Sequence, residues 1–161
     1  FIYERYRHQL INDFDRNVVD AVLALEPPLH QAQARVQACA NFARRPEAES
    51  LAAANKRITN LLKKADGAIE QIDTARLAEP AEQALAQVIV KLKPQAEALF
   101  AQGDFTGSLA TMAQAKDAVD AFFTDIMVMA DDPAVRANRL ALLASLHGVM
   151  NQVADISRLA Q

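Results

Sequence analysis

The chain has 161 residues, of which 52% are hydrophobic, which is enough to bury one core and predicts a single domain. Only four glycines and six prolines are present, tryptophan is absent and alanine is abundant, so the composition argues against a β-sheet and predicts an all-α fold. The formal net charge of −3 excludes a uniformly basic nucleic-acid-binding protein, so any polyanion contact must be local.

The cysteine content and the hydropathy pattern bear on the compartment. Cys39 is the only cysteine, which excludes an internal disulfide and favours a reducing compartment. No apolar run reaches the length of a membrane span. We expect no signal peptide, because Arg5 and Arg7 lie inside a mixed helical pattern rather than before an apolar run. We therefore expect a soluble, cytoplasmic protein without a membrane partner. Because the helical pattern begins at once with Phe1, we expect residues 1–161 to be one domain of a longer chain.

The first part of the chain is predicted to contain four helices. The first covers residues 1–11, and Asp15 is placed to cap a short second helix that ends before Pro27. A third helix is expected over residues 29–41. The fourth has Pro46 in its first turn, where proline is tolerated, and Asp66 with the following glycine is expected to stop it.

The second part begins with an irregular connector that extends to Glu79. A helix is predicted to start at Pro80, to be kinked or restarted at Pro94 and to end at residues 103–104, and another is expected over residues 105–123. The last helix is predicted to open with Asp132 as N-cap and to run to about Ala154. Leucines cover most of its sides, so we expect a long, largely buried C-terminal helix at the centre of a bundle.

Positive charge is concentrated in one segment of the chain. Residues 35–64 contain seven arginines and lysines against two glutamates, an excess of five positive charges. The remainder must then carry −8 to give the net charge of −3. A basic patch on an acidic body is typical of a local electrostatic contact with a polyanion.

The fourth predicted helix carries the main candidate site. Apolar residues recur on one side at spacings of three and four, whereas amide and basic residues are expected on a free face. Cations suit phosphates and amides suit base edges, so this face predicts binding of single-stranded RNA. The predicted RNA-binding residues of this helix are Asn55, Lys56, Arg57, Asn60, Lys63 and Lys64. A solvated helix face without a ligand is the alternative.

Three further arginines are candidates because of their charge: Arg35, Arg44 and Arg45. Phe42 precedes the last two and could stack an unpaired base, although the core is the favoured position for this residue.

The sequence offers no catalytic or metal site. The three histidines are isolated, Cys39 has no histidine beside it, and no glycine-rich phosphate loop or paired Glu-x-x-His motif is present. Three aspartates before the last helix lack the spacing of a calcium loop. We expect Arg136 and Arg139 to pair with these aspartates, which are Asp125, Asp131 and Asp132.

Two blocks of sequence, residues 51–64 and 122–143, resemble the C-terminal region of the bacterial glycyl-tRNA synthetase β subunit. Residues 57–62, Arg-Ile-Thr-Asn-Leu-Leu, are also similar to an Arg-Ile-x-x-Ile-Leu pattern of arginyl-tRNA synthetase. The resemblance implies an all-helical anticodon-binding domain of the DALR type, non-catalytic in itself. It would bind the anticodon stem and loop of a glycine tRNA, whose anticodon has two cytosines.

The same resemblance implies the partners. ATP would be used elsewhere, in the α subunit of an α2β2 tetramer, and this domain would hold no cofactor or metal. Its protein partners would be the remainder of the β subunit and the α subunit. The alternative function is a helical subunit-docking domain without direct base readout.

Overall fold

The computed structural model describes residues 2–65 and 72–160. Every regular element in these two ranges is a helix, which confirms the all-α prediction. The elements are α1 (Ile2–Leu10), α2 (Arg16–Leu23), α3 (Leu29–Ala43), α4 (Ala48–Lys63), the short 3-10 helix η1 (Thr74–Arg76), α5 (Pro80–Ala101), α6 (Phe105–Ala113), α7 (Lys116–Asp125), α8 (Pro133–Met150) and the 3-10 helix η2 (Ile156–Leu159).

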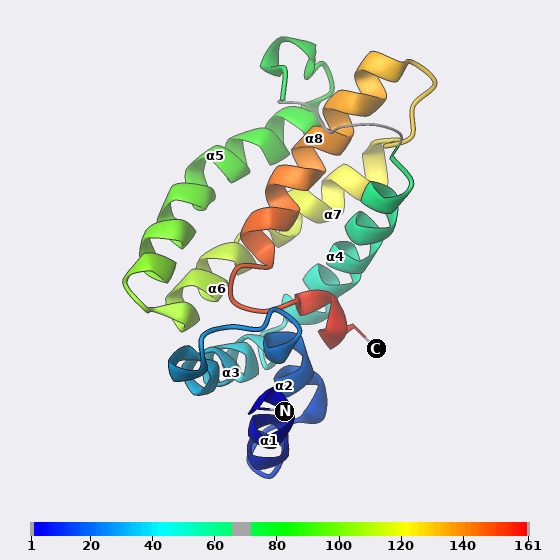
Figure 1. The fold of residues 1–161 in the computed structure, drawn as a ribbon. Coiled ribbons are helices and arrows are strands. Elements are labelled where there is room, and N and C mark those ends of the chain that lie inside the picture. Colours follow the sequence, from blue (N-terminus) through cyan, green and yellow to red (C-terminus); the bar gives the residue numbers. More distant parts are fainter. Residues whose placement is uncertain (1, 66–71, 161) are drawn as a thin grey trace.

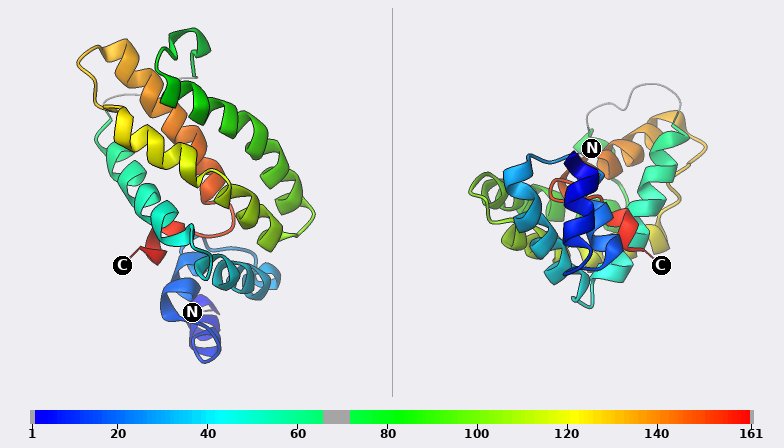
Figure 2. Two further views of the ribbon diagram at one scale, coloured as in Figure 1. Left: turned by 180° about the vertical axis from the view of Figure 1, so that it is seen from behind. Right: turned by 60° about the horizontal axis from the view of Figure 1, so that its bottom comes forward.

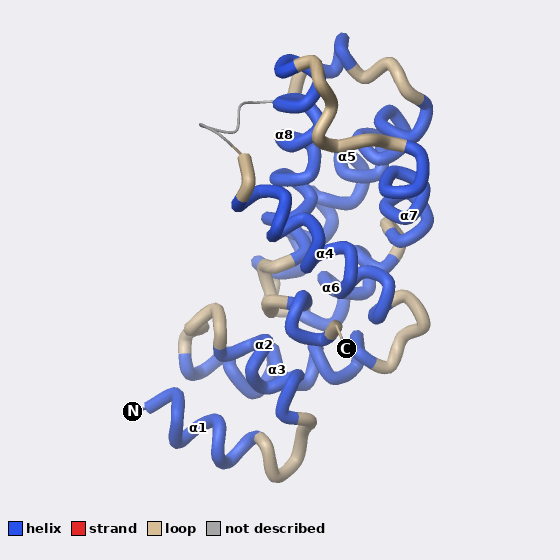
Figure 3. Tube along the Cα trace, turned by 90° about the vertical axis from the view of Figure 1, so that its right-hand side faces the viewer, coloured by secondary structure: helices blue, strands red, loops and turns tan. Residues whose placement is uncertain are grey.

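The helices form two parts that share one hydrophobic core. Helices α1, α2 and α3 gather at one end, while α4, α5, α7 and α8 run along the rest of the molecule (Figures 1 and 3). Helix α6 lies at the junction, where it packs against both α3 and α5. The chain returns at its end to this junction, because η2 packs against α2 and α4 (Figure 2).

Helix α8 is the long, largely buried C-terminal helix that the leucine pattern predicts. It lies between α4 and α5 and contacts both (Figure 1). Asp132 caps it as predicted, since its carboxylate accepts a hydrogen bond from the backbone N–H of Ala134 at 2.9 Å. The helix stops at Met150 rather than near Ala154, because the chain turns there and buries Val153 and Ala154 in a loop before η2.

Other helix boundaries also differ from the sequence-based prediction, since α4 begins at Ala48 and Pro46 lies in the turn before it. Pro94 neither kinks nor restarts α5, which is continuous from Pro80 to Ala101. Pro94 is exposed, as is Val90 one turn earlier, so the carbonyl that loses its helical donor lies on the solvent side. The segment over residues 105–123 is two helices, α6 and α7, and the turn between them buries Ala115 completely.

The predicted stop of α4 at Asp66 and the next residue lies outside the described residues. Lys64 is the C-cap of this helix. Asp15 stands at the predicted N-cap of α2, but its side chain forms no capping hydrogen bond.

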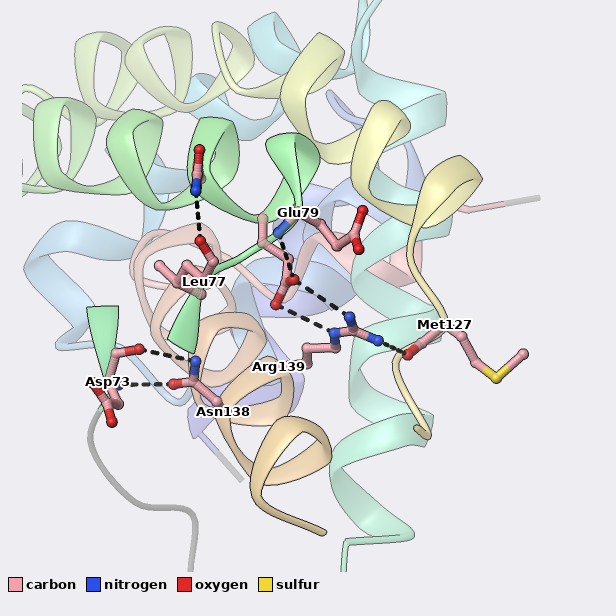
Figure 4. Close-up of polar contacts among 8 residues, drawn as sticks. Asp73, Leu77, Glu79, Met127, Asn138 and Arg139 are labelled. Atoms are coloured by element: carbon pink, nitrogen blue, oxygen red, sulfur yellow. Dashed lines mark hydrogen bonds and ion pairs between the residues drawn. The ribbon is translucent and has the colours of Figure 1, made fainter. Parts of the chain in front are cut away.

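A buried ion pair joins α8 to α5 and to the loop before α8. Arg139 lies 3.2 Å from the carboxylate of Glu82 and donates a second hydrogen bond of 2.6 Å to the carbonyl of Met127 (Figure 4). Glu82 is 1% exposed and also accepts a bond from the N–H of Glu79, which completes a capping box at the start of α5. The side chain of Arg139 thus joins three segments, which are α8, α5 and the loop before α8.

Neither arginine of α8 pairs with the aspartates that the sequence suggested. Arg139 binds Glu82, and Arg136 donates to the carbonyl of Ala130 at 3.1 Å. Asn138 binds both backbone polar groups of Asp73, at 2.7 and 3.0 Å, and so holds the connector before α5 (Figure 4). The aspartate prediction is wrong because α5 brings a buried acid to α8 from far along the chain.

We predict that Arg139→Ala lowers the free energy of unfolding by about 3 to 5 kcal/mol, because Glu82 would be left buried without its partner. The matched control is Arg76→Ala, which breaks a pair with Asp73 whose side chains are both 53% exposed. That change should cost less than about 1 kcal/mol. Urea denaturation measures both variants, and equal losses would contradict the structural role of the buried pair.

Candidate nucleic-acid interface

Helix α4 presents most of the predicted binding residues to solvent. The alanine-rich start of the helix packs against the core, and the polar residues of the second half face outward. Five predicted residues of α4 and its C-cap are exposed: Lys56, Arg57, Asn60, Lys63 and Lys64. The second half of α4 therefore has the accessible basic face that the sequence predicts.

Arg44 and Arg45 are also exposed, at the corner between α3 and α4. They precede α4, whereas Lys63 and Lys64 end it, and 16 helical residues separate the two groups by roughly 24 Å. Arg45 lies 3.6 Å from Glu47, which partly offsets its charge. The structure thus separates the basic segment into two groups, one at each end of α4.

Asn55 does not share the exposed face of α4. It is 0% exposed and forms a reciprocal amide pair with Asn151. The Asn55 amide donates to the Asn151 oxygen at 2.7 Å, and the Asn151 amide donates back at 3.3 Å. The prediction that Asn55 is free to bind a ligand is wrong, because the segment after α8 packs over it. Of the two predicted amides, Asn60 reaches the surface.

The amide pair is part of a larger polar cluster between α4 and the end of α8. Asn151 donates to the carbonyl of His147 at 2.9 Å and accepts from the N–H of Ile156 at 3.2 Å. One turn after Asn55, the Thr59 hydroxyl lies 3.0 Å from Nε2 of His147. Burial lowers the pKa of His147 below its ordinary value of 6.5, against an opposing effect of Asp155. These contacts fix the position of α4 along the axis of α8.

Arg35 is a structural cation rather than an exposed one. It is 7% exposed, and its guanidinium lies 5.0 Å from the ring centroid of Phe100 and 5.2 Å from that of Phe105. It donates to the carbonyl of Gln152 at 3.1 Å and to the side chain of Gln31 at 2.7 Å. Burial lowers its pKa from the ordinary value, but an arginine remains charged. The expectation of an accessible Arg35 is therefore wrong.

Phe42 is 2% exposed and belongs to the hydrophobic core. Its position excludes the base-stacking role that its neighbours suggested.

Two exposed or partly exposed residues near α4 were not among the predicted binding residues. Phe123 of α7 lies under Arg57, whose guanidinium carbon is 4.4 Å from the centroid of the ring. Met127, in the loop after α7, is 72% exposed. The sequence signal was the alternation at residues 126–129, where Ile126 and Val128 are buried and the two methionines are not.

The described residues show no catalytic arrangement. No group of three or more histidine, cysteine, aspartate or glutamate side chains among them could hold a metal ion. Cys39 is buried, and burial raises the pKa of its thiol to about 12, so it stays protonated at neutral pH. None of the described helices is both long enough and apolar enough to cross a membrane.

A family model described as the DALR anticodon binding domain matches residues 51–157. The chain belongs to this DALR family. The match begins in α4 and ends in η2, so it contains the exposed basic half of α4 and the polar cluster that anchors it. Helices α1 to α3 precede the matched part.

The similarity of the chain to curated proteins extends beyond the family match. The chain is 60% identical to the glycine–tRNA ligase beta subunit of Leptothrix cholodnii, over 88% of this chain and 20% of that protein. It is 53% identical to the subunits of the same name from Methylobacillus flagellatus and Janthinobacterium sp. (strain Marseille), in each case over 99% of this chain and 23% of the relative. The resemblance inferred from the sequence is confirmed, and the chain spans about a fifth of the length of these relatives.

We predict that Asn55→Ala lowers the free energy of unfolding of the DALR domain by about 1 to 3 kcal/mol, because Asn151 loses a buried partner. The matched control is Asn60→Ala on the exposed face of the same helix, which should be neutral or slightly stabilising since alanine has the higher helix propensity. Thermal or urea unfolding compares the two variants. An equal, small effect of both would exclude the amide pair as an anchor of α4.

The lowered pKa of His147 predicts a pH dependence of stability. The unfolded chain binds a proton at this site more readily than the folded chain, so stability is complete above pH 6.5 and is lost as the pH falls through the folded pKa. Lowering the pH from 7.5 to about 5 should reduce the unfolding free energy of the wild type more than that of His147→Gln. Parallel pH profiles of the two proteins would contradict this assignment.

Proposed function

We propose that the DALR domain binds the anticodon stem-loop of glycine tRNA through the exposed second half of α4, within a glycine–tRNA ligase β subunit. The observation that carries the proposal is the grouping of four exposed cations and one exposed amide on α4, inside the segment that matches the family. Lysines neutralise phosphates without regard to sequence, whereas amides can read base edges.

Asn60 is the proposed contact to a base. Its amide both donates and accepts hydrogen bonds, and cytosine offers an amino donor beside carbonyl and ring-nitrogen acceptors. The unpaired anticodon exposes these groups, whereas the paired stem is held by its shape and its phosphates. Arg44 and Arg45, about a helix length away, are placed for phosphates of the stem rather than for the same loop.

The remaining parts of the proposal concern the whole enzyme. Glycine would be joined to the tRNA in an ATP-dependent reaction at a site in the α subunit, within an α2β2 tetramer in the cytoplasm. The DALR domain itself would hold no cofactor and would contribute tRNA recognition. The names of the relatives support the ligase and subunit roles.

A subunit-docking role is the second candidate, and one surface favours it. The outer face of α5 carries Val90, which is 74% exposed. Val90 lines a shallow cavity of about 460 Å³ together with Leu77, Ala86 and Lys91 among others. Helices α4 and α5 flank α8 on opposite sides (Figure 1), so a protein contact at α5 leaves the basic face of α4 open. The two roles are therefore compatible.

The test compares two double charge reversals. Lys63→Glu with Lys64→Glu should weaken binding of the glycine tRNA anticodon stem-loop at least about tenfold and reduce the salt dependence of the affinity. The control is Lys91→Glu with Lys93→Glu, which makes the same charge change on α5 and should leave binding nearly unchanged.

The measurement is a titration at low and moderate salt, with the normal loop and with a loop whose two cytosines are replaced. Preference for the cytosines supports anticodon reading. If both double variants lose the same affinity, the loss reflects net charge rather than a contact at α4. Equal affinity for the normal and the altered loop would favour the docking role.

A further inference from the structure

The guanidinium of Arg57 lies over the ring of Phe123 at the surface of the molecule. The guanidinium lies 4.4 Å from the ring centroid, and Arg57 is nevertheless exposed. The ring is held in turn by Phe122, which is fully buried and meets it edge to face at 5.6 Å and 84°. A ring packed against the core thus holds the guanidinium in place, while Arg57 as a whole remains exposed to solvent.

Met127 adds an apolar side chain on a fixed backbone. It is 72% exposed, while Ile126 and Val128 on either side are buried. Arg139 donates a 2.6 Å hydrogen bond to the Met127 carbonyl, and the side chain points away from this network (Figure 4). The loop backbone is therefore held while the methionine faces outward.

The Arg57–Phe123 contact and the loop that carries Met127 lie beside the second half of α4. Helices α4 and α7 pack together, and the Arg57–Phe123 contact joins them. The loop that leaves α7 passes the end of α4, where Lys63 and Lys64 lie, in both views of the bundle (Figures 1 and 2). A partly apolar surface therefore lies beside the end of α4 that carries an exposed pair of positive charges.

We infer that Arg57 on Phe123, together with Met127, forms a stacking platform for one unpaired base of the anticodon loop, with Lys63 and Lys64 on the neighbouring phosphates. This inference rests on the proposed function and adds the residues that hold the base. Unpaired bases stack on guanidinium planes and aromatic rings, and the polarisable thioether of methionine packs well against π-systems. The adjacent cations favour RNA over an apolar protein segment as the occupant.

The test combines a charge-conserving variant with abasic RNA. Arg57→Lys keeps the positive charge but removes the planar group, so it should weaken binding of the glycine tRNA anticodon stem-loop about tenfold with an unchanged salt dependence. Met127→Ser should also weaken binding of this stem-loop. The matched control is Val90→Ser, which alters an equally exposed apolar side chain on α5 and should leave the affinity unchanged.

Single abasic substitutions at each loop position then locate the base. At one loop position, removal of the base should lower the affinity of the wild type about tenfold. For the loop that lacks this base, Arg57→Lys and the wild type should have the same affinity, because both changes remove the same stacking contact. Thermal unfolding of every variant checks that the fold is retained, and Met127→Ser supplies a second test if Arg57→Lys is unstable.

The outcomes separate the inference from the proposed function. Wild-type affinity of both Arg57→Lys and Met127→Ser, with binding still lost on reversal of Lys63 and Lys64, would overturn the platform and leave the proposed function standing. A loss in Arg57→Lys that is the same for every abasic loop would also overturn it. Absence of binding by the wild-type chain would overturn both.

Discussion

The accessible face of α4 depends on the buried amide pair between Asn55 and Asn151. A helix packed only through apolar contacts can slide or rotate at small cost, because hydrophobic burial is not directional. Two amides that satisfy each other inside the protein remove this freedom, since any shift leaves polar groups buried without partners. The pair thereby determines which residues of α4 face solvent, and these include the lysines, Arg57 and Asn60.

Helix α8 is anchored by polar groups at both of its ends and by leucines between them. Near its start, Arg139 and Asn138 hold α5, the connector and the loop that carries Met127. At its end, His147 and the segment beyond it hold α4. The apolar middle of α8 supplies most of the burial, whereas the two polar ends fix the register of its neighbours. The elements beside the candidate RNA surface, α4 and the loop after α7, are both attached to α8 in this way.

The positive charges of residues 35–64 have different roles that a charge count cannot separate. Arg35 lies over two neighbouring aromatic rings and joins α3 to the loop after α8. Lys63 and Lys64 end a helix, where a positive charge is favourable for the helix dipole as well as for a bound phosphate. Exposed lysines at this position suit both the helix dipole and a bound phosphate. An effect of their substitution on stability therefore does not identify them as ligand contacts.

The sequence by itself determined the helical class, most helix starts, the buried C-terminal helix and the family. These features depend on local chemistry, such as alanine content, the cap at Asp132, the proline after it and the spacing of leucines. Only the tertiary structure decided that Asn55 is buried and Asn60 is free, that Arg35 is internal and that the chain turns between α6 and α7. Helical periodicity places a residue on a face, but the partner that covers this face can lie far away in sequence. Asn151 is 96 residues beyond Asn55, and no local pattern predicts that contact.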